Sequence, residues 1–284
     1  MKKYLFPLFL ALISLNQINS QIPILRPLPR NISKMTLVDQ GNIRVLYALN
    51  AKDIKDRETY DDLQRLDIGS KMSKYYSFFV YNCDSLVTEY RRSNPKTQTS
   101  PTWTGVKGKD ENWSECYYSE YYKYYSINKS VEHARMPMWI RSYKYSEITP
   151  VQKWEIHSET LMICGYLCQR ATCNFRGRNY IAWFTKTIPI SNGPWKFGGL
   201  PGLILKVYDE DKLYTFECVG VENHVISFGI FMFNSKYYSN IERSDLLKLQ
   251  KDIHDDFFKV ANATIRYNDG KIPEKQPYHP LELD

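Results

Sequence analysis

The polar side chains between residues 176 and 196 are the part of this sequence best suited to binding. Basic and amide groups are interleaved there with two tryptophans: Arg176, Arg178, Asn179, Trp183, Lys186, Trp195 and Lys196. Arginine binds carboxylates through paired hydrogen bonds, and an indole ring accepts apolar or cationic groups. If these side chains converge, they would hold an anionic ligand or the end of a peptide. We favour a structural role over a ligand here, because an arginine at a bend donates to several backbone carbonyls.

The sequence contains no catalytic motif that is recognisable from spacing. It has no G-x-S-x-G turn, no H-E-x-x-H pattern and no EF-hand loop. Strand alternation would put Glu155, His157 and Glu159 on one face, as an acid/base cluster or, as we favour, a solvent-facing row. His254 is expected on the solvated side of a helix. We therefore predict no catalytic residue, no metal site and no cofactor.

Six cysteines are candidates for disulfides: Cys83, Cys116, Cys164, Cys168, Cys173 and Cys218. An even number in an exported chain is typical of disulfide pairing. Cys164 and Cys168 are read as lying on one strand, about 13 Å apart, which is too far for a bond between them. We expect a Cys83–Cys116 bond and a bond from Cys218 to one of the other three cysteines.

The first twenty residues are typical of a secretory signal peptide. Lys2 and Lys3 precede an apolar run from Tyr4 to Leu15, and cleavage is expected near Ser20. No later stretch is apolar enough to span a bilayer, so an integral membrane protein is not expected. The net charge of +7 is dispersed among carboxylates, which argues against a nucleic-acid partner. An exported protein, periplasmic or extracellular, is the expectation.

The remaining chain, 21–284, is predicted to be one mainly β domain of the α+β type. Short apolar–polar runs separated by turn residues predict a curved antiparallel sheet, or meander, with strands near 42–51, 63–68, 74–81, 140–145, 152–157, 161–175, 179–185, 203–208 and 213–221. The tyrosines between 117 and 126 are also interpreted as strand rather than as a binding surface.

Two helices and two irregular segments complete the prediction. A short helix is expected at 82–92, and an amphipathic helix from Asp245, capped by Ser244, should pack its apolar side on the sheet. Residues 93–112 are expected to form an exposed loop, and 271–284 an extended tail.

The segment GGLPGLIL, Gly198 to Leu205, predicts a rigid corner before a buried strand. Pro201 and Gly202 suit the central positions of a type II turn. No phosphate-binding pattern is present, because the glycines lead into a strand and not a helix. The residues assigned to this structural motif are Gly198, Gly199, Leu200, Pro201, Gly202, Leu203 and Ile204.

The same segment resembles the GLPGLI family, which is named after it. Further matches are Gly165-Tyr-Leu-Cys168, Phe175-Arg-Gly-Arg-Asn179, Ala182-Trp183-Phe184-Thr185, Ile188-Pro189-Ile190 and Gly193-Pro194. The resemblance implies an exported protein of the Bacteroidetes envelope, and it implies no established reaction. Cys164 and Cys173 depart from the single-cysteine pattern of that family.

These observations favour a non-enzymatic binding or accessory protein. Its partner would be a lipid, a peptide or an outer-membrane receptor, as the curved sheet suggests only by analogy. The alternative is a hydrolase that acts on peptides or glycans, with a site assembled from residues distant in sequence.

Overall fold

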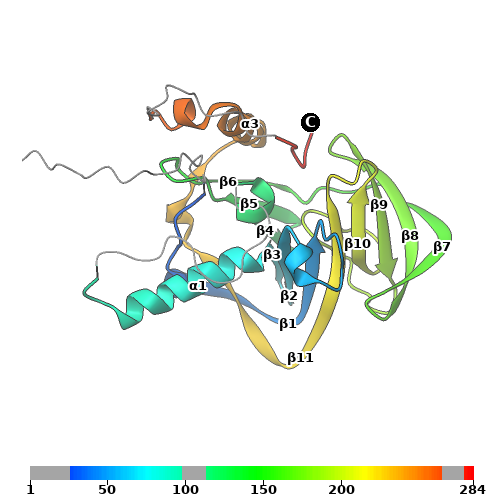
Figure 1. The fold of residues 1–284 in the computed structure, drawn as a ribbon. Helices are drawn as coiled ribbons and strands as arrows, with labels where there is room; N and C mark the ends of the chain where they lie inside the picture. The colour runs from blue at the N-terminus through cyan, green and yellow to red at the C-terminus, as the bar shows by residue number, and fades with distance from the viewer. Residues whose placement is uncertain (1–25, 98–112, 264–277) are drawn as a thin grey trace, which may run out of the picture.

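The computed structural model describes residues 26–97, 113–263 and 278–284 (Figure 1). The predicted signal peptide at 1–20 lies outside the described residues. So do residues 98–112 of the predicted loop and residues 271–277 of the predicted tail.

Twelve strands form one open sheet in the order β12-β6-β5-β4-β3-β2-β1-β11-β10-β9-β8-β7. Within the described residues the neighbouring strands are antiparallel, except that β12 pairs with β6 in parallel. The mainly β fold is thus confirmed. The strands are β1 (Met35–Leu49), β2 (Asp62–Gly69), β3 (Met72–Ser77), β4 (Ser119–Tyr124), β5 (Lys129–Ala134), β6 (Tyr143–Ile148), β7 (Glu155–Ile163), β8 (Tyr166–Phe175), β9 (Arg178–Thr185), β10 (Leu203–Asp209), β11 (Thr215–Phe233) and β12 (Ser239–Asn240).

The sheet bends about the long pair β1 and β11. Their register shifts between Leu37 and Asp39, between Gly41 and Ile43, and again after Leu46. Such bulges add a residue to one strand and increase its local bend and twist. Figure 1 shows the result: β7 to β10 stand at one side, turned against β1 to β6, and β11 joins the two halves.

In the part of the chain that the structure describes, three α-helices and three 3-10 turns accompany the sheet: α1 (Phe78–Ser93), α2 (Glu115–Tyr118), α3 (Arg243–Val260), and turns at Ile32–Lys34, Arg57–Thr59 and Ser235–Tyr237. α1 begins earlier than predicted because the hydroxyl of Ser77 accepts the Val80 N–H at 3.0 Å and caps the helix there. None of the described helices is both long and apolar enough to cross a membrane.

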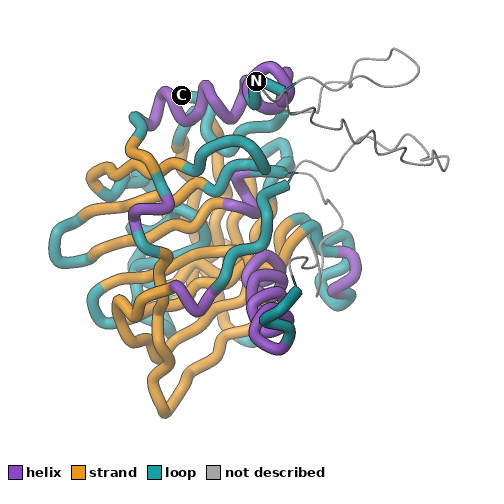
Figure 2. Tube along the Cα trace, turned by 90° about the vertical axis from the view of Figure 1, so that its left-hand side faces the viewer, coloured by secondary structure: helices purple, strands orange, loops and turns teal. Residues whose placement is uncertain are grey.

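α3 confirms the predicted C-terminal helix, but not its cap. The helix begins after Glu242, which makes no side-chain capping bond, so the assignment of Ser244 as the cap is wrong. Its buried face, Leu246, Ile253 and Phe257, packs with Ala134 at the end of β5 and with neighbouring aromatic residues. Figure 2 shows α3 lying across one end of the molecule, beside the C-terminus.

The GGLPGLIL segment forms the corner that was predicted, with a different turn. The left-handed residue is Gly199, at φ +81°, whereas Gly202 has φ +157°, which a type II turn does not have at that position. β10 starts directly afterwards, and Leu203 and Ile204 are fully buried. The hydroxyl of Tyr47 donates to the Ile204 carbonyl at 2.7 Å, so the corner is tied to β1 across the core.

The predicted single strand at 161–175 is in fact a hairpin. Cys164 and Gly165 have φ of +49° and +82°, so the chain reverses there between β7 and β8. The distance argument for Cys164 and Cys168, which assumed one strand, therefore does not apply. A left-handed Cys is uncommon, which explains why the turn was not visible in the sequence.

The predicted disulfides are not present, since none of the six cysteines is bonded to another. Cys83 lies within α1 and Cys116 within α2, and both thiols are buried. Burial as small hydrophobic side chains replaces the predicted pairing. Cys218 comes nearest to the prediction, because Cys164 is the neighbour that most strongly raises the pKa of its thiol.

Candidate functional site

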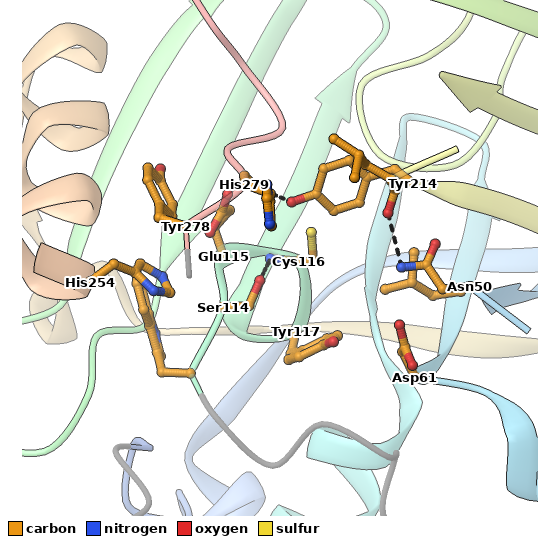
Figure 3. A pocket seen from close by; sticks show the side chains of 13 residues that line it. Asn50, Asp61, Ser114, Glu115, Cys116, Tyr117, Tyr214, His254, Tyr278 and His279 are labelled. Atoms are coloured by element: carbon orange, nitrogen blue, oxygen red, sulfur yellow. Dashed lines mark hydrogen bonds between the residues drawn. The ribbon is translucent and has the colours of Figure 1, made fainter. Parts of the chain in front are cut away.

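A pocket of about 370 Å³ opens where the ends of several elements meet (Figure 3). Asn50 follows β1 and Tyr214 precedes β11, while α2 supplies Glu115 and Cys116. The side-chain amide of Asn50 donates to the Leu213 carbonyl at 3.1 Å and its oxygen accepts the Thr215 N–H at 2.8 Å. These bonds fix the sheet side of the pocket.

Glu115 is the buried acid of the pocket, with 5% of its surface exposed. Its side chain accepts the backbone N–H of Leu281 at 3.3 Å. Burial raises the pKa of Glu115 to about 7, against the lowering effect of backbone N–H donors. The nearby acids Glu132 and Glu282 raise it further. Glu115 therefore changes charge close to neutral pH.

His254 of α3 lies between two rings on the opposite wall. Its imidazole stacks on Tyr278 with centroids 4.5 Å apart and lies 5.3 Å from the Trp113 ring. Burial lowers the pKa of His254 to about 4, so the ring is neutral at pH 7. Its Nε2 and the Tyr278 hydroxyl have no hydrogen-bond partner among the described residues. The prediction that His254 is solvated is thus wrong.

Cys116 lines the same pocket but is not an activated nucleophile. Burial, with the charge of Glu115, raises the pKa of its thiol well above the usual value. A reactive cysteine needs the opposite shift, since the thiolate is the nucleophile. A metal site is not formed either: among the residues described, no three His, Cys, Asp or Glu side chains are grouped to hold an ion.

The C-terminal segment 278–284, called here the strap, completes the pocket. Tyr278 and His279 line it, and the Tyr214 hydroxyl donates to the His279 carbonyl. Figure 1 shows the strap, in red, between α3 and the strands β9 and β10. Beyond the pocket, Leu281 is buried in the main core.

Basic side chains hold the strap through the Glu282 carboxylate. Lys196 and Arg243 contact this carboxylate directly, and Arg176 Nε lies 3.3 Å from its Oε2. Burial opposes ionisation of Glu282, but these cations outweigh it and lower its pKa. Glu282 is 6% exposed and Lys196 4%, so the pair is held away from solvent.

The strap is also bound through its backbone. Arg178 donates to the Pro280 carbonyl at 2.6 and 3.2 Å, and its other nitrogen lies 3.3 Å from Asp209. The Leu283 N–H donates to the Arg176 carbonyl at 3.0 Å. Gly177 allows this approach, because a Cβ there would lie 2.8 Å from that of Leu283.

Three of the side chains predicted to bind thus converge on one peptide segment: Arg176, Arg178 and Lys196. Trp195 is adjacent but lies in the core, where its ring meets that of Phe197 at 5.2 Å. Asn179 and Trp183 do not join them. Asn179 is exposed and donates to Glu210, and Trp183 is a half-buried side chain at the edge of the core.

The sequence analysis missed the pocket itself. Its polar residues come from segments that have no common motif, and Glu115 stands next to a stretch interpreted as loop. One usable signal was present: Ser114 caps α2, with its oxygen accepting the Cys116 N–H at 3.2 Å. A Ser-Glu pair at a helix start would have placed Glu115 in an ordered turn.

Residues 176–206 match the model of a family described as "Protein of unknown function (Porph_ging)". This stretch contains Arg176, Arg178 and Lys196 as well as the GGLPGLIL corner. No curated protein matches the chain.

Two solved structures resemble the chain, "Structure of PNGF-II in P21 space group" and "Structure of PNGF-II in C2 space group". The sequence identities are 15% and 13%, and the TM-score is 0.44 for both. The alignments cover 74% of this chain and 34% and 33% of the solved chains. The chain thus spans about a third of the length of the structures it matches.

Proposed function

We propose that this chain is an exported envelope protein of the GLPGLI type that binds a peptide segment without catalysing a reaction. The match over residues 176–206 supports the family assignment, because that stretch includes the motif Gly198–Leu205. The apolar run before Ser20 supports export to the periplasm or the cell exterior.

One observation carries the proposal: side chains of this protein hold a peptide segment, its own strap, beside a pocket of about 370 Å³. The Glu115 side chain accepts a strap N–H, Arg178 donates to a strap carbonyl, and Lys196 contacts the Glu282 carboxylate of the strap. These are the contacts by which proteins recognise extended peptides.

The test is native mass spectrometry of the protein recovered from its own cell envelope. A co-purifying peptide that is released on denaturation supports the proposal. Recovery of a bound lipid instead would identify a lipid, and not a peptide, as the ligand. Recovery of a single outer-membrane receptor by pull-down, with no small ligand, would make the chain an accessory subunit. Sequencing of the mature N-terminus checks the cleavage near Ser20.

A hydrolase is the second candidate, and Glu115 is the observation that favours it. A buried carboxyl with a pKa of about 7 can both give and take a proton at neutral pH. Turnover in a panel of peptide and glycan substrates, lost in Glu115→Gln with the fold intact, would replace the binding proposal. The same panel without turnover leaves binding as the function.

A further inference from the structure

The pocket has a chemical character that selects among ligands. Among the described residues that line it, none is lysine or arginine, whereas Asp61 and Glu115 both carry carboxyls. The basic side chains nearby are turned to the strap and already hold Glu282 and Pro280. An anionic group entering the pocket would therefore meet carboxyls and no cation.

Aromatic rings form much of the remaining wall. Trp113, Tyr117, Tyr214 and Tyr278 line the pocket. Figure 3 shows the three tyrosines on different sides of Glu115 and Cys116. The faces of such rings attract a positive charge. Rings and carboxyls together are the surroundings that favour an organic cation.

Two buried polar atoms that can accept a hydrogen bond complete the set, the imidazole nitrogen when the ring proton is on Nδ1. The Tyr278 hydroxyl oxygen has no partner among the described residues, and neither has Nε2 of the neutral His254 ring. An ammonium group has three N–H donors and a guanidinium has five, with no acceptor on either. A ligand of this kind supplies donors to atoms that are otherwise buried without a bond.

We propose that this pocket binds the side-chain cation of a lysine or arginine in the peptide ligand. The inference rests on the proposed peptide-binding function and names the group that the pocket takes. A cation near Glu115 favours its ionised form, so binding should release the proton that Glu115 holds at neutral pH.

The ionisable neighbours of Glu115 determine which control variants a test of the pH dependence needs. The ionisable groups that face it are Glu132 on β5, Glu282 and His279 on the strap, and His254 on α3, with Asp61, Cys116, Tyr214 and Tyr278 in the pocket. Glu282 has a lowered pKa and His254 a pKa of about 4, so neither changes charge near pH 7. Burial also raises the pKa of Glu132. The variants below change Glu115 and His279 separately.

The experiment is calorimetric titration of the full exported chain with end-blocked Ala-Lys-Ala and with the same peptide carrying norleucine in place of lysine. We expect the norleucine peptide to bind about tenfold more weakly, because it has the same length without the charge. If only ionised Glu115 binds the cation, a pKa of about 7 makes the lysine peptide bind about tenfold more tightly near pH 8 than near pH 6.

Variants identify the group responsible. Glu115→Gln should remove the pH dependence and the proton release, while His279→Asn should keep both. Asp61→Asn leaves Glu115 in place and should weaken binding of the lysine peptide but not binding of the norleucine peptide. Glu89→Gln changes an exposed carboxyl on α1, far from the pocket, and should leave binding unchanged.

The other possible results separate the cation assignment from the peptide-binding function. Equal binding of the two peptides, or a pH dependence that persists in Glu115→Gln, overturns the cation assignment. If peptides still co-purify with the protein, the proposed peptide-binding function stands without the cation assignment. If neither probe binds and no peptide co-purifies, the proposed function itself fails.

Discussion

Glu282 is the residue through which the strap is most firmly held. Its carboxylate is buried and contacts Lys196, Arg243 and Arg176, while Lys196 also lies 3.5 Å from Glu132. Removal of one member of a buried ionic cluster leaves the others without full compensation, which costs more than the loss of an exposed pair. The remaining acids near Lys196 should reduce that cost.

Glu282→Gln should lower the free energy of unfolding by about 2–4 kcal/mol, because Lys196 and Arg176 lose their buried counter-charge. Urea titration followed by tryptophan fluorescence measures it. Glu89→Gln breaks an exposed pair with Arg92 and should cost less than about 1 kcal/mol. An equally small loss in Glu282→Gln would show that the strap contributes little to stability.

Glu115 predicts a pH dependence of stability with a definite sign. Its pKa is about 7 in the folded protein, against an ordinary value of 4.5. The contribution of the protonated carboxyl is complete below about pH 4.5 and is lost as the pH rises to about 7, which amounts to ~3 kcal/mol. Unfolding free energies measured at both pH values should show that the native chain loses ~3 kcal/mol more between them than Glu115→Gln does.

The basic cluster could be predicted at the residue level, but the pocket could not. Arg176, Arg178 and Lys196 lie close together in sequence, so their common role follows from composition and spacing. Leu281 and Glu115, in contrast, are 166 positions apart, and only the folded sheet brings them into contact. The group that the basic cluster holds was not predictable either, because no sequence pattern shows that these side chains bind the strap of the same chain.

At the level of elements, the corner before β10 shows what a motif can and cannot tell. The alternation of Leu203 and Leu205 predicted the strand, and Pro201 predicted its start. The turn geometry was not predictable, since glycine accepts several backbone conformations and the choice between Gly199 and Gly202 depends on packing against β9.

Gly202→Ala should destabilise the protein by ~3 kcal/mol or prevent folding, because the added Cβ would overlap the backbone carbonyl of Thr185. Gly198→Ala is the matched control, since the nearest atom to its Cβ would be the Ser191 carbonyl oxygen at 3.5 Å. Thermal unfolding of the two variants should separate them clearly. Similar melting temperatures would mean that the corner adjusts to a side chain.

Hairpins also account for the errors in strand boundaries. The turn at Cys164 is made by residues that occur equally well inside strands, so the pattern from 161 to 175 appeared continuous. The predicted row of Glu155, His157 and Glu159 is confirmed as solvent-facing in part: the two acids are exposed, and His157 is half-buried and bonded to Thr172.

At the scale of the molecule, β7 ends the open sheet, and no strand of the described residues pairs with its outer edge. An exposed edge can pair with the edge of another copy, and charged side chains are a common means of preventing this. Glu155 and Glu159 lie on β7, which also exposes Leu161 and Met162. The acids are therefore expected to keep the protein monomeric.

The double variant Glu155→Val, Glu159→Val should associate in a concentration-dependent manner, because β7 then offers an apolar edge without charge. Sedimentation velocity measures the oligomers. Replacement of two exposed charges on α1, Glu89→Val with Arg92→Val, should leave the protein monomeric. Association of both variants alike would assign the effect to surface hydrophobicity in general.

The strap makes its contacts across long stretches of chain: Arg178 is 102 positions from Pro280, and Glu115 is farther still from Leu281. Contacts of such separation carry a large loop-closure entropy and form slowly. The two halves of the sheet must fold before the strap has a surface to dock on. Refolding should therefore show a late phase in which the ring of Tyr278 stacks on His254, after the bulk of the β structure has appeared. A newly synthesised molecule would pass through an interval in which its sheet is complete but its pocket is not.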